Sequence, residues 1–184
     1  MSQPSQINFR KVGHGRLALF HRPRGTDFPT LFTLGCTHVI TLLKESEGAE
    51  RYGNMTRESG MEWIWLPVPN GKYPDADVQH LLMEAMTKLS DLLDDGKSLL
   101  IHCSAGIHRT GMVTYGLLRW RGLDRSQAMR LIDSIRKETA EGMMEKRMRW
   151  GDEIARPADS QDFLWYSSAR KFVNRLIIRL FRPR

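Results

Sequence analysis

One short segment constrains this chain more than any other: residues 101–111, which read IHCSAGIHRTG. The apolar residues 99–102 predict a buried strand, and from Thr110 onward apolar residues recur at helical spacing. A tight loop that joins a strand to a helix N-terminus brings several backbone amides together, and such amides bind anions. This loop places Cys103 where the amides meet, with Arg109 at its far end. The segment therefore predicts a phosphate-binding loop that carries its own nucleophile.

The residue types in this loop fit that chemistry. Loop amides stabilise both the thiolate of Cys103 and a phosphate dianion above it. The planar fork of Arg109 can hold two phosphoryl oxygens, which a lysine cannot match. Gly106 lets the backbone approach the phosphate, and the Thr110 hydroxyl is expected to hydrogen-bond the sulfur as it leaves the phosphoenzyme. We expect the phosphate to be bound by Arg109 together with Ser104, Ala105, Gly106, Ile107 and His108.

At these residues the chain resembles the cysteine-dependent protein tyrosine phosphatases, whose signature is His-Cys, five residues, Arg, then Ser or Thr. The match is HCSAGIHRTG, in which His108 stands where the tyrosine-specific enzymes commonly have glycine. The resemblance is strong between His38 and Ile135, and the short chain and its order of elements resemble the small dual-specificity branch. The resemblance implies hydrolysis of phosphoproteins through a cysteinyl-phosphate, with the choice between phosphotyrosine and phosphoserine or phosphothreonine left open.

Alternating strands and helices predict an α/β fold whose central, mostly parallel sheet is covered by helices on both faces, like that of the protein tyrosine phosphatases. Catalysis in such a fold belongs at the carboxyl end of a strand, which is where Cys103 lies. Asp124 is the predicted N-cap of a later helix. The predicted strands are residues 16–21, 38–43, 61–68 and 99–102, and the predicted helices are residues 28–34, 48–59, 77–93, 110–121, 125–137 and 142–154.

The reaction also needs a carboxylic acid that protonates the leaving oxygen and later activates water. The resemblance implies an aspartate upstream of the cysteine, within Pro-Asp, three residues, Pro. The local match is residues 69–74, which has Asn70 at that position, and an amide cannot be the acid. We take Asp75 as the candidate acid and Asp77 as its alternative, although Asp75 is equally a candidate N-cap for the following helix. The remaining alternative is that no acid exists and catalysis is slow or lost.

The histidines lack the spacing of metal ligands, and we expect neither a metal nor a cofactor. His102 is predicted to fix the loop geometry through hydrogen bonds from its ring rather than to transfer protons. His108 has two interpretations. It is either a solvent-facing loop residue or a group that touches substrate at the rim and adds positive charge below about pH 6.5.

The loop interior contains no lysine. The resemblance implies lysines there in phosphatases that act on phosphoinositides, so a phosphorylated protein is the favoured substrate and a phosphoinositide is an alternative. A third hypothesis, motivated by Asn70, is a phosphate-recognising interaction domain with weak or lost catalysis.

The net charge of +7 arises at the C-terminal end of the chain. Residues 1–162 hold 22 Lys and Arg against 21 Asp and Glu, whereas residues 163–184 hold six basic residues and no acidic one. Apolar residues recur there at helical spacing, which predicts a basic amphipathic helix after a phosphatase domain of residues 1–162. We expect its apolar stripe to pack on the domain. Docking to an acidic partner or to an anionic membrane surface is the alternative, and the lack of a base-stacking aromatic pattern argues against nucleic acid.

Composition and cysteine content set the expected class and compartment. A chain with 41% hydrophobic and 27% charged residues fits one globular domain with a core. No apolar run has the length of a membrane span, and the first residues lack the order of a secretory signal, so we expect a cytoplasmic protein. The two cysteines, Cys36 and Cys103, are expected to be reduced, with Cys36 packed in a core.

Overall fold

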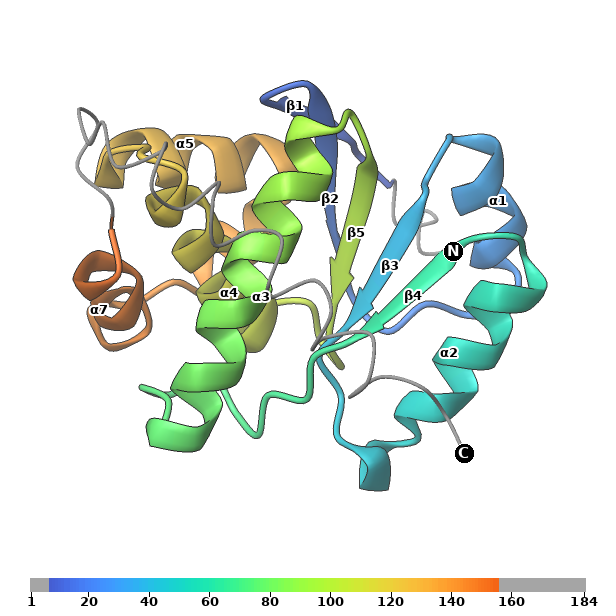
Figure 1. Cartoon of the computed structure of the whole chain (residues 1–184), viewed down its shortest axis with the longest axis horizontal. Helices are drawn as coiled ribbons and strands as arrows, with labels where there is room; N and C mark the ends of the chain where they lie inside the picture. The colour runs from blue at the N-terminus through green and yellow to red at the C-terminus, as the bar shows by residue number, and fades with distance from the viewer. Residues whose placement is uncertain (1–6, 156–184) are drawn as a thin grey trace, which may run out of the picture.

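A five-stranded sheet forms the centre of the molecule (Figure 1), whose computed structural model describes residues 7–155. The strand order is β1-β2-β5-β3-β4, and every neighbouring pair is parallel except β1 and β2. The strands are β1 Arg10–Val12, β2 Gly15–Phe20, β3 His38–Thr41, β4 Glu62–Trp65 and β5 Ser98–His102. This arrangement confirms the predicted α/β fold class with its mostly parallel sheet.

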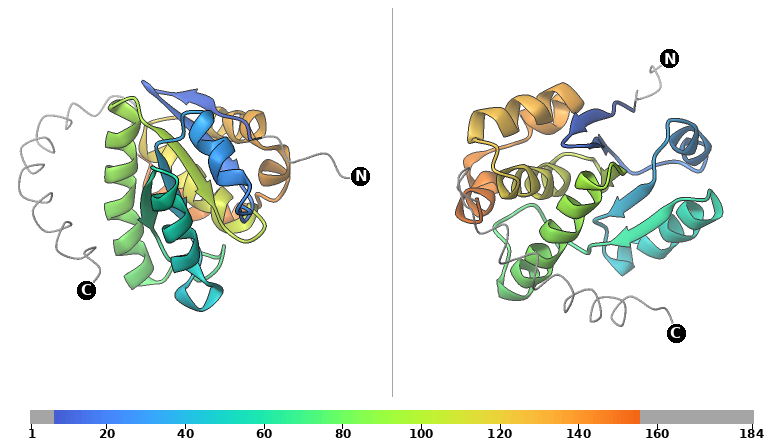
Figure 2. Two further views of the ribbon diagram at one scale, coloured as in Figure 1. Left: turned by 90° about the vertical axis from the view of Figure 1, so that its right-hand side faces the viewer. Right: turned by 45° about the horizontal axis from the view of Figure 1, so that its top comes forward.

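Helices cover both faces of the sheet (Figures 1 and 2). One face carries α1 Asp27–Thr33, the short 3₁₀ helix η1 Glu45–Glu47 and α2 Ala49–Glu58. The other face carries α3 Ala76–Asp94, α4 His108–Trp120, α5 Arg125–Ile135, α6 Lys137–Glu141 and α7 Glu145–Glu153. Each layer buries its own apolar cluster against the sheet, and the larger cluster lies under α3, α4 and α5.

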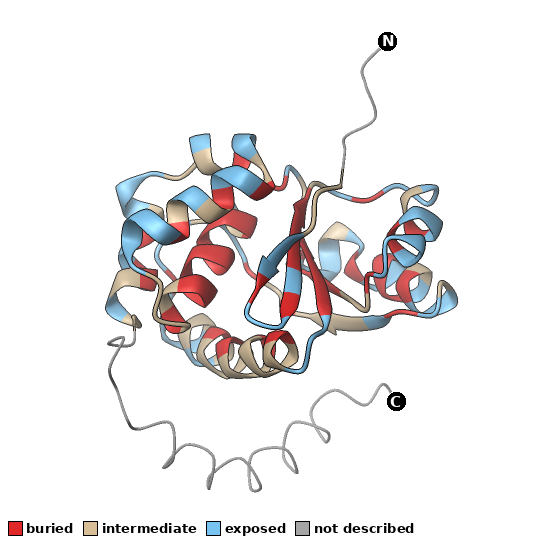
Figure 3. Ribbon diagram, turned by 90° about the horizontal axis from the view of Figure 1, so that it is seen from above, coloured by how far each residue is buried: buried red, intermediate tan, exposed pale blue. Residues whose placement is uncertain are grey.

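The central strand β5 is buried on both faces, as Figure 3 shows for the middle of the sheet. Its alternating side chains divide between the two clusters: Leu99 and Ile101 join the larger cluster, and Leu100 joins the smaller one. Burying each such side chain contributes roughly 1.5–3 kcal/mol to folding. The strand that leads to Cys103 is therefore among the most firmly held parts of the chain.

The observed elements match the prediction in type and order but differ in extent. The predicted strand at residues 38–43 ends at Thr41, and the predicted strand at residues 61–68 ends at Trp65, two residues before Pro67. The helix predicted from Thr110 begins at His108, so Arg109 belongs to its first turn. Asp124 caps α5 as predicted, accepting a hydrogen bond from the Gln127 amide at 2.7 Å. Strand β1, η1 and α6 were not predicted.

The predicted basic helix at residues 163–184 lies outside the described residues, so that prediction stays a prediction. Among the helices that the structure describes, none combines the length and the apolar character that crossing a membrane requires.

Candidate active site

The catalytic loop joins β5 to α4, and its backbone wraps around the sulfur of Cys103. Cys103 is 3% exposed, and its Sγ accepts the amide N–H of Gly106 at 3.2 Å. Gly106 has φ +69°, and a Cβ there would lie 2.3 Å from the carbonyl oxygen of Phe20. Only glycine fits this position, because a side chain would meet both backbone strain and a fixed carbonyl group. The loop thus directs an amide at the sulfur, where negative charge is stabilised.

The carbonyl groups of the loop are held from the opposite side. Arg136 Nη1 donates to the carbonyl oxygens of Gly106 at 2.6 Å and Ala105 at 3.2 Å, and Thr139 Oγ1 also donates to Gly106 at 2.6 Å. Arg136 is the N-cap of α6, and Thr139 lies within this helix. These bonds tie the loop backbone to α6, so the loop is held in place before any anion arrives.

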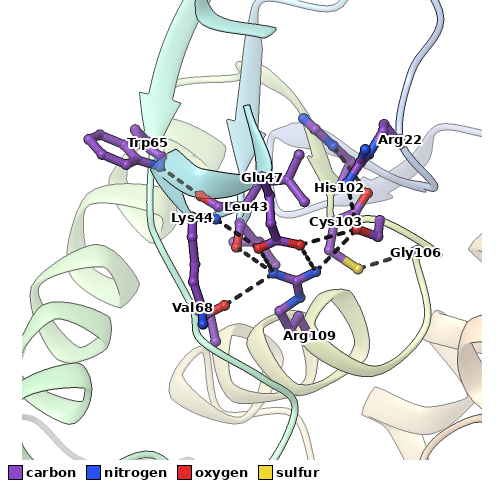
Figure 4. Close-up of polar contacts among 12 residues, drawn as sticks. Arg22, Leu43, Lys44, Glu47, Trp65, Val68, His102, Cys103, Gly106 and Arg109 are labelled. Carbon is purple, nitrogen blue, oxygen red and sulfur yellow. Dashed lines mark hydrogen bonds and ion pairs between the residues drawn. The ribbon is translucent and has the colours of Figure 1, made fainter. Parts of the chain in front are cut away.

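Arg109 is fixed by a carboxylate from a distant part of the chain (Figure 4). Its two terminal nitrogens donate to Glu47 at 2.7 and 2.8 Å, and Nη1 also approaches the carbonyl oxygens of Leu42 and Val68 at 3.4 and 3.3 Å. Hydrogen bonding from Arg109 lowers the pKa of Glu47 to about 2, and the same pair raises the pKa of Arg109. A guanidinium has five N–H donors, so a phosphate can bind at the Nε side of the fork while the terminal nitrogens keep Glu47.

Ser104 connects this ion pair to a second arginine. Its Oγ donates to Glu47 at 3.3 Å and accepts from Arg109 at 3.3 Å and from Arg22 at 2.9 Å. The Arg22 amide also donates to the Ser104 carbonyl at 2.9 Å. Arg22 therefore lies against the catalytic loop and adds positive charge at its rim.

His102, directly before the nucleophile, is fully buried and hydrogen-bonded on both ring nitrogens. Nδ1 contacts the Cys103 carbonyl at 3.4 Å, and Nε2 contacts Thr41 Oγ1 at 2.8 Å, which in turn accepts the indole N–H of Trp63 at 2.9 Å. Burial lowers the pKa of His102 to about 3, so the ring is neutral at physiological pH. Since the carbonyl can only accept, Nδ1 carries the proton and Nε2 accepts from Thr41.

The loop of residues 69–74 packs directly on the catalytic loop. A Cβ at Gly71 would lie 2.7 Å from His108 Cβ and 3.2 Å from the Arg109 nitrogen. Burial, followed by the charges of Arg147 and Lys146, lowers the pKa of His108. His108 is nevertheless exposed, which agrees with its interpretation as a solvent-facing loop residue, and the lowered pKa leaves its ring neutral at neutral pH. Its contact with substrate stays a prediction.

The two candidate acids, Asp75 and Asp77, and Asn70, which stands where the family's aspartate is expected, are placed as follows. The side-chain oxygen of Asn70 accepts the Lys72 amide at 2.8 Å, which stabilises the turn. Asp75 is the N-cap of α3, and its carboxylate accepts the Val78 amide at 3.0 Å. Asp77 is exposed in the first turn of α3. The structure therefore gives Asp75 the capping role in this loop state, and its role as an acid, like that of Asp77, stays a prediction.

Two further predicted site residues are Thr110, expected to support the sulfur, and Ile107, expected to bind the phosphate. Thr110 Oγ1 is buried and has no hydrogen-bond partner among the described residues, which leaves its hydroxyl unsatisfied beside the catalytic loop. Ile107 packs on Gly142, where a Cβ would lie 2.0 Å from the Ile107 side chain.

Cys36 is buried in the smaller cluster, as predicted, and burial raises its pKa to about 12. Both cysteines are reduced.

Glu47, Arg22 and Arg136 were missed by the sequence analysis. Each acts on the catalytic loop from another element, and none has a motif of its own. One signal could have pointed to Glu47. It follows a predicted strand, and the carboxyl ends of parallel strands lie at the same edge of a sheet; in the structure Thr41, the last residue of that strand, pairs with His102. Within residues 7–155, no group of three or more His, Cys, Asp or Glu side chains is placed to hold a metal ion.

Comparisons with known proteins agree with this geometry. The fold and the loop define a phosphatase of the dual-specificity and protein tyrosine phosphatase class. The chain belongs to the family described as the Swiss Army Knife protein, DSP-PTPase phosphatase domain, whose family model matches residues 6–155. The resemblance seen in the sequence is thereby confirmed.

A curated relative and two solved structures illustrate the likeness. Laforin of Mus musculus is 28% identical over an aligned length of 102 residues, and the match covers 47% of this chain and 30% of laforin. Kinase-associated phosphatase, with serine replacing its catalytic cysteine, has a TM-score of 0.65 at 19% identity and covers 83% of this chain and 95% of its own. The core catalytic domain of a PP-IP phosphatase from S. cerevisiae has a TM-score of 0.60 at 19% identity, covering 92% and 95%. At these identities the two structures establish the fold alone.

Proposed function

We propose that this phosphatase hydrolyses phosphomonoesters on proteins through a cysteinyl-phosphate formed at Cys103. One observation carries the proposal: the Gly106 amide and the Glu47-anchored guanidinium of Arg109 belong to the same loop that buries the Cys103 sulfur. This arrangement supplies a nucleophile, an N–H cradle and a bidentate clamp, which are the parts that phosphoryl transfer to a thiolate needs.

The reaction proceeds in two steps. The Cys103 thiolate donates an electron pair to phosphorus, and the bond between phosphorus and the leaving oxygen breaks, with its electron pair on that oxygen. A carboxylic acid, for which Asp75 is the candidate, protonates the leaving oxygen. Water then attacks the phosphocysteine, its proton passes to the same carboxylate, and the S–P bond breaks to restore the thiolate. The buried Thr110 hydroxyl is available to donate to the departing sulfur.

Asp75 must exchange its helix-capping bond for the substrate in this scheme. Asp75 is exposed and stands at the end of the loop whose Gly71 packs on the catalytic loop. The scheme requires a movement of residues 69–75 that carries this carboxyl group to the leaving oxygen. The two roles then belong to two loop states. Losing the cap costs about 1 kcal/mol, which substrate binding can offset.

The choice of a phosphoprotein rests on the loop interior. Residues Ser104 to His108 contain no cationic side chain at neutral pH, because the pKa of His108 is lowered, and a singly phosphorylated side chain fits such a cradle. A phosphoinositide is the second candidate, favoured by one observation: Arg22 on the rim hydrogen-bonds Ser104 and could pair with an additional phosphate.

The first experiment is turnover of a small aryl phosphate with and without a chelator, followed by a panel of phosphopeptides and a soluble phosphoinositide. We expect turnover that survives the chelator, is abolished by Cys103→Ser, and favours phosphopeptides in kcat/KM by at least about tenfold. Activity that persists in Cys103→Ser or is lost with chelator contradicts the mechanism. If the enzyme prefers the phosphoinositide and this preference falls in Arg22→Ala, the substrate is a phosphoinositide and not a phosphoprotein. Binding of a phosphopeptide without turnover supports an interaction domain.

A further inference from the structure

The open edge of the sheet is a surface that the catalytic site does not use. Strand β4 pairs with β3 alone among the described strands. The amides of Glu62 and Leu66 point toward β3 and donate to the carbonyl oxygens of Thr37 and Thr41 at 2.9 and 3.0 Å. Backbone groups alternate along a strand, so those of Trp63 and Trp65 face the open side. Proteins cover or blunt such an edge because it can pair with other chains.

An apolar groove follows this edge, between β4 and α3, which lie side by side in Figure 2. Its walls include Ile64, Trp65, Leu81 and Ala85, all only partly buried. The indole rings of Trp63 and Trp65 stack on each other and pack against the smaller cluster, on the opposite face of the sheet from α3. The groove therefore offers apolar surface that a further element could bury.

Helix α3 gives this groove an acidic margin. The helix contains Asp77, Glu84, Asp91 and Asp94, against Lys88 as its single Lys or Arg. Glu84 lines the groove, and Asp77 and Asp91 lie seven residues to either side of it, which places the three carboxylates along one line of the helix. The occupant that fits is an apolar segment with positive charge along one side.

The chain itself contains such a segment. Residues 163–184 hold six basic residues and no acid, and within them Lys171, Arg175, Arg179 and Arg182 recur every three or four positions. The apolar residues of the same stretch recur at the spacing that predicts a helical stripe: Phe172, Val173, Leu176, Ile177, Leu180 and Phe181. Its pattern matches an apolar groove with an acidic margin.

The chain also leaves the described region at a suitable point. Glu153, at the end of α7, accepts a hydrogen bond from Tyr73, three residues before the first residue of α3, and Arg149 lies over the Tyr73 ring at 5.2 Å. Residues 156–162 span up to about 23 Å when extended. Twenty-two residues extend about 33 Å as a helix, which matches the roughly 28 Å of α3.

We propose that residues 163–184 fold back over the groove, with their apolar stripe against β4 and α3 and their basic residues along the acidic line of α3. This contact covers the open sheet edge and neutralises α3 within one chain. It is independent of the substrate proposed above.

Disulfide cross-linking in the full chain tests the contact. In a Cys103→Ser background, Ala85→Cys is combined in turn with Val173→Cys, Ile177→Cys and Leu180→Cys. The three partner positions sample different alignments of the segment along α3, so that one of them can bring its cysteine close enough to the cysteine introduced on α3 to form a disulfide. The matched control places the first cysteine at Thr33, which is exposed on α1 on the opposite face. We expect a cross-link within one chain at least about tenfold faster than for the Thr33 pairs. Equal rates, or cross-links only between chains, overturn the proposal.

Hydrogen exchange on the intact wild-type chain gives a second measurement that needs no cysteine. We expect amides within residues 172–181 to exchange at least about tenfold slower than in an unstructured peptide, and Glu84→Lys to reduce that protection more than Glu58→Lys, which makes the same charge change on exposed α2. Unprotected amides overturn the proposal. So does protection that requires anionic vesicles or rises with protein concentration, because the occupant is then a membrane or a second copy.

Discussion

Replacing Glu47 with glutamine should loosen Arg109 without changing the volume of either side chain. The Arg109 hydrogen bonds lower the pKa of Glu47 from 4.5 to about 2, which sets an upper limit of roughly 3 kcal/mol on the interaction, at about 1.4 kcal/mol per pH unit. The Glu47 side chain is 26% exposed, so solvent screens part of this energy, and Arg109 keeps the Leu42 and Val68 carbonyls. We expect Glu47→Gln to lower transition-state stabilisation by about 1–2 kcal/mol, because Arg109 is less well positioned. This corresponds to a decrease of roughly 5–30-fold in kcat/KM.

The pH dependence of unfolding checks the physical cause. A carboxyl whose pKa is lower in the folded state contributes stability above its unfolded pKa and loses it as the pH falls toward the folded value. The stability difference between wild type and Glu47→Gln should therefore be constant above about pH 5 and shrink between the unfolded value of 4.5 and the folded value of about 2. Urea unfolding across this range measures it, with Glu45→Gln, exposed in the same turn, as control. A difference that is independent of pH would refute the reasoning.

Three further changes address the rest of the site. Asp75→Asn should remove the basic limb of the pH–rate profile and lower kcat on poor leaving groups by about 10²-fold or more, whereas Asp77→Asn keeps that limb; the reverse pattern identifies Asp77 as the acid. Asn70→Asp should leave the rate on poor leaving groups within about twofold if Asp75 is the acid, whereas a rise of orders of magnitude would show that the acid is otherwise missing. Gly106→Ala should destabilise the protein by more than about 2 kcal/mol, because its Cβ would meet the Phe20 carbonyl at 2.3 Å; an unchanged urea midpoint would contradict this.

The catalytic loop could be predicted because its information is local. A strand, a glycine turn and a helix start within a few residues of one another, and Cys103 and Arg109 follow that order in the chain. The long apolar strands and helices were predictable for the same reason. Strand β1 was not, since three residues show no periodicity, and its place depends on pairing with β2 across a short turn.

Long-range partners escaped the sequence. Glu47 lies 62 residues before Arg109 and meets it because the carboxyl ends of β3 and β5 share one edge of the sheet. Its neighbours in sequence are polar and exposed, so nothing local separates it from an ordinary surface glutamate. Asp75 is the opposite case, because its local sequence favoured two roles equally: general acid and N-cap of the following helix. In the structure its carboxylate caps α3.

The hydrogen bonds behind the nucleophile also have a direction. Trp63 can only donate, Thr41 accepts from it and donates to His102, and His102 donates to the Cys103 carbonyl. Every proton in this relay is committed, from the outermost strand to the backbone of the nucleophile. The relay ends at the carbonyl oxygen of Cys103, so strand β4 fixes the backbone of the nucleophile through three side chains, while the sulfur is left to the Gly106 amide on the substrate side.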